Sequence, residues 1–108
     1  MKTEAIEDRA HQALKFLTDT DELAADLKCK AEMAEAAYAA TVDAVVLHSE
    51  GPIEIRKAKA RTSGEAQAAW DRFVIAQRDY DATANKRKTE SLAVEWCRSL
   101  YAAYRQGK

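Results

Sequence analysis

The sequence predicts an all-α protein: an elongated, coiled-coil-like antiparallel helical hairpin with an additional N-terminal helix. Three observations lead to this fold class. The 108 residues are 32% charged and rich in alanine, with only three glycines and one proline, a composition typical of long helices. Apolar residues recur at three- and four-residue spacing along most of the chain. The stretch Glu65–Arg105 contains neither Gly nor Pro, the two residues that most often end a helix.

This C-terminal stretch determines the shape that we expect. Its 41 residues would form a helix about 61 Å long, whereas a compact chain of this size has a radius of gyration of only about 13 Å. We therefore expect a rod, with the rest of the chain covering its apolar side. Trp70, Phe73, Gln77 and Tyr80 begin that side.

The remaining helices follow from start and stop signals. The segment 18–22, Thr-Asp-Thr-Asp-Glu, has the side chains that cap a helix and the negative charge that suits its first turn. It indicates that a new helix begins there, although one continuous helix with a kink is the alternative. Gly51-Pro52 ends that helix, and Thr62 with Glu65 fits a capping box. We expect one domain, 1–108, with helices at about 3–17, 20–49, 53–61 (short) and 63–105.

The simplest antiparallel register pairs positions whose numbers sum to about 114. Tyr38 then faces Gln77, and Cys29 lies far from Cys97, which predicts two free thiols. The first helix is expected to cover Trp96 and Leu100 with Leu14 and Leu17. If it does not, a second subunit should cover Trp96, because a thin seam between helices buries little surface. We therefore expect a homo-oligomer, with a dimer as the simplest form.

Charge is distributed unevenly although the net charge is −1. Residues 1–50 carry 5 Lys/Arg and 11 Asp/Glu, whereas residues 51–108 carry 12 and 7. The simpler interpretation is an acidic arm folded onto a basic arm; the other is a basic face for nucleic acid. The basic connector concentrates that charge, and its candidate binding residues for nucleic acid or an acidic partner are Arg56, Lys57, Lys59 and Arg61.

Catalytic and cofactor signatures are weak. The segment from Asp8 to His11 resembles half of a carboxylate–histidine metal site, but such sites need a second half, and the three glycines do not form a phosphate-binding loop. We expect no catalytic residue, no metal and no cofactor. The sequence shows no signal peptide and no apolar run long enough to cross a bilayer, so we expect a cytoplasmic protein without membrane contact.

A second candidate surface lies near the C-terminus, where aromatic and arginine side chains of the kind that dominate protein interfaces cluster. Trp96 is expected mainly in the core, whereas Tyr101 and Tyr104 point partly off that face and favour a partner contact. The residues of this candidate interface are Trp96, Arg98, Tyr101, Tyr104 and Arg105.

Two short segments resemble small helical proteins of tailed phages and prophages. They are 13–21, Ala-Leu-Lys-Phe-Leu-Thr-Asp-Thr-Asp, and 94–100, Val-Glu-Trp-Cys-Arg-Ser-Leu, followed by Arg-Gln-Gly at 105–107. The resemblance implies a phage accessory protein from a region with recombination and replication genes, located in the host cytoplasm. It supplies no assigned enzymatic activity and no catalytic residue.

Taken together, these patterns favour a non-enzymatic accessory or adaptor that acts through helix-surface contacts with a protein partner. The alternative is a nucleic-acid-binding accessory that uses the basic connector.

Overall fold

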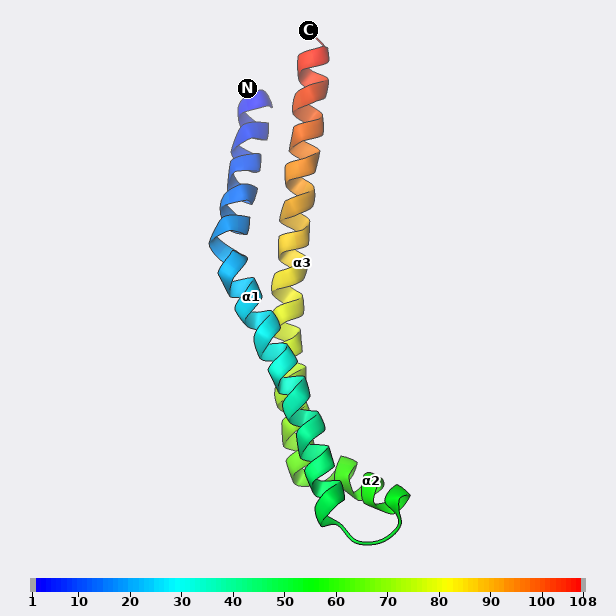
Figure 1. Ribbon diagram of the computed structural model, residues 1–108. Helices are drawn as coiled ribbons and strands as arrows, with labels where there is room; N and C mark the ends of the chain where they lie inside the picture. The colour runs from blue at the N-terminus through cyan, green and yellow to red at the C-terminus, as the bar shows by residue number, and fades with distance from the viewer. Residues whose placement is uncertain (1, 108) are drawn as a thin grey trace. The chain divides into compact units, whose positions relative to one another are not determined.

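The computed structural model describes residues 2–107, which form three helices and no strand (Figure 1). The helices are α1 (Lys2–His48), α2 (Ile53–Thr62) and α3 (Gly64–Gln106). The all-α class is therefore confirmed. The long C-terminal helix is also uninterrupted, as the lack of Gly and Pro between Glu65 and Arg105 predicts.

The helices contribute to two compact units. Unit 1 combines the chain through Ala25 with the chain from Asp81 onward, and unit 2 is Asp26–Tyr80. Within unit 1, Arg9 of α1 contacts Glu90 of α3, and Thr20 of α1 contacts Arg87 of α3. Moving forward along α1 from Arg9 to Thr20 therefore corresponds to moving backward along α3 from Glu90 to Arg87. The paired segments of α1 and α3 are therefore antiparallel there. Unit 2 contains α2 and the helix segments that it joins.

The expected break between helices 3–17 and 20–49 is wrong, because α1 continues through it. Figure 1 shows α1 as one unbroken ribbon that bends in its blue part. The Thr20 hydroxyl, an expected capping group, donates to the Phe16 carbonyl one turn earlier at 2.7 Å. Arg87 of α3 donates to the Leu17 carbonyl and to Thr20 Oγ1, both at 2.7 Å, and to Asp21 at 3.2 Å. Such bonds within a helix favour bending over termination.

The connector begins at Gly51, which has a φ of 105°, a conformation that L side chains rarely adopt. Pro52 precedes α2 with φ −61° and ψ 150°. Thr62 was expected to cap α3, but it lies within α2 and its hydroxyl donates to the Ala58 carbonyl. Ser63 takes the capping role instead, because its Oγ accepts the Ala66 N–H at 3.1 Å.

The helices approach one another through small side chains. No large side chain among the described residues is fully buried, and the buried apolar residues are Ala13, Ala31, Ala60, Ala66, Ala69 and Cys97. Unit 2 adds an aromatic cluster in which Tyr38 meets Trp70 edge-on at 5.1 Å and Trp70 meets Phe73 at 5.5 Å. The expected register is wrong here, because Tyr38 packs on Trp70 and these two numbers sum to 108, whereas the expected register had a sum of about 114. The aromatic ring contact offers more buried apolar area than the expected Gln77 amide would.

Candidate protein-contact surface

One side of α3 in unit 1 exposes three large apolar residues, and we call these residues the Trp96 face. Trp96 is 67% exposed, Leu92 56% and Leu100 37%. They follow one another at four-residue spacing, which places them on one side of a helix. Beside them lies a hollow of about 460 Å³, whose lining residues are Arg9, Thr89, Leu92, Ala93, Glu95, Trp96 and Ser99.

An ion pair joins the two helices near this hollow. Arg9 of α1 donates to both carboxylate oxygens of Glu90 on α3, from Nη1 to Oε1 at 3.2 Å and from Nη2 to Oε2. The Glu90 side chain is only 15% exposed. The hydrogen bonds from Arg9, together with its positive charge, hold the pKa of Glu90 below its usual value, and the same contact raises the pKa of Arg9. This bidentate contact fixes the position of α1 along α3.

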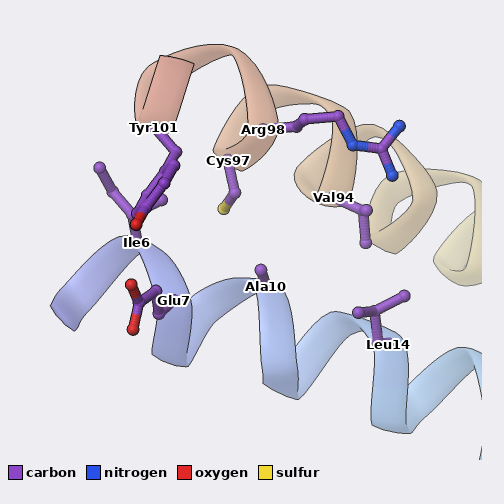
Figure 2. Close-up of a pocket in the computed structure, with 8 residues that line it drawn as sticks. All are labelled: Ile6, Glu7, Ala10, Leu14, Val94, Cys97, Arg98 and Tyr101. Atoms are coloured by element: carbon purple, nitrogen blue, oxygen red, sulfur yellow. The ribbon is translucent and has the colours of Figure 1, made fainter. Parts of the chain in front are cut away.

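A second cavity, of about 300 Å³, lies between α1 and α3 (Figure 2). Ile6, Ala10 and Leu14 line it from α1, and Val94 and Tyr101 line it from α3. The thiol of Cys97 points toward Ala10, while the Arg98 side chain runs along α3. Cys97 is nearly fully buried, so this cavity is apolar at its base, with the charges of Glu7 and Arg98 on its border.

The predicted C-terminal interface therefore divides between two sides of α3. Trp96 was expected to be covered by Leu14 and Leu17; this is wrong, because Trp96 is exposed and Leu14 lines the cavity instead. Tyr101 also lines that cavity, with the Arg105 guanidinium 6.0 Å from the centre of its ring. Tyr104 is 38% exposed. The four-residue spacing predicts that Leu92 lies beside Trp96, but no sequence pattern predicts the hollow, because a depression depends on how two helices are spaced.

The basic connector lies in unit 2, on α2. Arg56 is turned back onto the end of α1, where Nη1 donates to the Val46 carbonyl at 3.5 Å, while Nε is buried and has no hydrogen-bond partner among the described residues. Lys57, Lys59 and Arg61 are exposed. A cation near the last carbonyls of a helix is favourable, so Arg56 has a structural role that its three neighbours lack.

Between residues 2 and 107, no three His, Cys, Asp or Glu side chains gather as a set that could hold a metal ion. Both thiols are free, as predicted, with Cys29 exposed and Cys97 buried. Over the same residues, no helix has a stretch apolar enough to cross a membrane.

Comparison with known proteins adds no relative: no family model, no curated protein and no solved structure matches the chain.

Proposed function

We propose that this chain is a non-enzymatic accessory or adaptor protein of a tailed phage or prophage, and that it acts in the host cytoplasm through contacts made by its helix surfaces. The observation that carries the proposal is the exposure of Trp96 within the Trp96 face. Tryptophan is the residue type most enriched at the energetic centres of protein interfaces. An exposed cluster of Trp with two Leu is costly to leave in water unless a partner covers it.

The surroundings of Trp96 support a protein partner. The neighbouring hollow offers a depression for an inserted side chain, and its lining combines apolar and charged groups. Interfaces commonly have this arrangement of an apolar centre with a polar border. The phage assignment is supported separately by the resemblance of the segments 13–21, 94–100 and 105–107. A gene position among phage recombination and replication genes would support that assignment.

Site-specific crosslinking tests the contact. A photoreactive phenylalanine analogue replaces Ser99, which lines the hollow, in cells that express the chain from its native locus. The matched control carries the analogue at Leu47, which is 77% exposed and would therefore report non-specific adhesion more strongly. We expect adducts with a distinct polypeptide from position 99 but not from position 47, and we expect Trp96→Ala to abolish them.

Two results would contradict the adaptor role. One is the same set of adducts from both positions, which would indicate non-specific adhesion. The other is adducts that contain only copies of this chain, because an adaptor must also contact a different protein.

A second candidate function is nucleic-acid binding through α2, which the exposure of Lys57, Lys59 and Arg61 favours. Phosphate contacts by such residues weaken steeply as salt increases. Titration of single- and double-stranded DNA at 50 and 200 mM salt should then show a loss of affinity of about tenfold or more for three contacts. The variant with all three residues changed to Glu should not bind. Absence of binding by the unmodified protein at 50 mM salt would eliminate this candidate.

A further inference from the structure

We infer that a second copy of this chain covers the Trp96 face, in a two-fold antiparallel contact between the α3 helices centred near Leu92. This inference rests on the proposed function, because it names a weak, reversible occupant of the same surface, which a different protein would displace. Such a contact requires a self-complementary surface. Three features of unit 1 are relevant to it: the shape of the face, its charges and its size.

The first feature is that a projection and a depression share one face. Trp96 is the most exposed large apolar residue among the described residues of unit 1, and the hollow that adjoins it is also lined by Thr89 and Leu92. A two-fold contact places the same patch of both copies against each other. Rotation about an axis near Leu92 brings Trp96 of each copy over the Thr89–Leu92 end of the other copy's hollow. Each copy therefore supplies both the inserted ring and the site that receives it.

The second feature is the charge pattern at the edge of the face. Lys88 and Glu95 are exposed, and neither takes part in an ion pair within the described chain. Because they are seven residues apart, they lie on the same edge of α3, two turns from each other. An antiparallel contact centred between them sets Lys88 of each copy against Glu95 of the other. A parallel contact would set like charges against each other, so the pattern favours the antiparallel arrangement.

The third feature is the size of the face. Leu92, Trp96 and Leu100 expose on the order of 300 Å² of mostly apolar surface in each copy. A standard interface buries about 800 Å² per partner, so the border must contribute more area than the apolar centre. The contact is therefore expected to be reversible, with a dissociation constant in the micromolar range.

Charge exchange tests this geometry, because both residues are exposed and the variants should fold. In sedimentation velocity at low salt, Lys88→Glu alone and Glu95→Lys alone should each dimerise about tenfold more weakly than the unmodified chain. An equimolar mixture of these two variants should recover association, since every contact is then attractive. The double variant K88E/E95K should recover it by itself. Failure of both the mixture and the double variant to recover would overturn the antiparallel arrangement.

The tryptophan itself gives the second measurement. In a Trp70→Phe background, Trp96 is the only tryptophan, and its emission should shift to shorter wavelength as the concentration rises through the dimerisation range. Trp96→Ala should weaken association about thirtyfold or more. A chain that stays monomeric at several hundred micromolar would overturn the inference, as would a dimer that survives Trp96→Ala. Neither result bears on crosslinks from position 99 to a different protein. The crosslinking experiment therefore tests the proposed function independently of the dimer.

Discussion

At the scale of single residues, two arginines of unit 1 connect α1 to α3. Arg9 reaches from α1 to the carboxylate of Glu90, while Arg87 reaches from α3 to Leu17, Thr20 and Asp21. Because Ala13 and Cys97, the buried residues of this unit, are small, they contribute little apolar area each. Polar contacts between the helices therefore carry a larger share of the specificity than they would in a thick core.

The Arg9–Glu90 contact predicts a pH dependence. The pKa of Glu90 is lowered in the folded protein by the hydrogen bonds from Arg9, so its contribution to stability is present above the ordinary pKa of a glutamate. It is lost as the pH falls through the lowered value, because the folded state must then take up a proton.

Glu90→Gln should therefore be less stable than the unmodified protein at neutral pH, and the two should converge in acid. Urea unfolding at several pH values measures the difference. Glu32→Gln is the control, because Glu32 is exposed and lies in unit 2. An equal difference between Glu90→Gln and the unmodified protein at every pH would contradict the prediction.

Arg87 should contribute to the stability of unit 1 through its charged hydrogen bonds. Its side chain is 21% exposed, and a hydrogen bond from a charged donor contributes about 1.5–3 kcal/mol. Arg87→Met keeps the apolar stem but removes the bonds, so we expect a loss of about 1–2 kcal/mol in the free energy of unfolding. The exposed Arg72 of unit 2 provides the control, since Arg72→Met should change stability by less than about 0.5 kcal/mol. Equal losses in the two variants would show that the Arg87 bonds have no net effect.

At the scale of elements, capping groups have different roles in the two places where helix ends were expected. Ser63 accepts the Ala66 N–H and begins α3, whereas Thr20 donates back to Phe16 and α1 continues. Both are hydroxyl residues that suit a helix start. The difference is that Arg87 occupies the other side of the Thr20 hydroxyl, which holds Thr20 inside the helix.

The two glycines that border α2 provide a matched comparison. Gly51 has a φ of 105°, and a Cβ at this position would meet no atom within 4 Å. A Cβ at Gly64, which begins α3, would also meet no atom within 4 Å. Only backbone strain therefore opposes a side chain at Gly51. We expect Gly51→Ala to lower the free energy of unfolding by about 1 kcal/mol, and Gly64→Ala to leave it unchanged or raise it by up to about 1 kcal/mol. Chemical denaturation measures both, and a destabilised Gly64→Ala with an unaffected Gly51→Ala would contradict this assignment.

At the scale of the whole molecule, the two units stabilise themselves differently. Unit 2 contains the ring cluster of Tyr38, Trp70 and Phe73 and four of the buried alanines. Unit 1 has two buried residues, a bidentate ion pair and an exposed tryptophan. Trp96 of unit 1 is 67% exposed and Trp70 of unit 2 is 44% exposed, so a partner that covered Trp96 would remove more tryptophan surface from water.

Hydrogen exchange should show this difference as a dependence on protein concentration. If a second copy covers the Trp96 face, the amides of residues 85–100 should gain protection as the concentration rises, because association stabilises the folded state by mass action. The amides of residues 66–76 in unit 2 provide the internal control and should change little. Equal gains in both units would mean that the contact is not confined to unit 1.

The sequence pattern predicts which residues of the candidate site share a helix side. It does not predict which residues of the other helix lie next to them. The spacing of Leu92, Trp96 and Leu100 predicts that they share one side of a helix, and the side chains of Lys57, Lys59 and Arg61 are exposed as a charged run usually is. Which helix covers which side depends on register. A shift of register along α3 decides whether Leu14 meets Trp96 or borders the cavity beside Val94.

The sequence by itself determined the helical class, the continuity of α3 and the connector at Gly51-Pro52, because propensity, spacing and backbone freedom are local properties of the chain. The tertiary structure decided that α1 passes through its capping signal, that Arg56 bonds to the end of α1, and that Trp96 remains in water. These outcomes depend on contacts between residues far apart in the chain, such as Arg87 with Thr20. No local pattern fixes the register that brings such residues together.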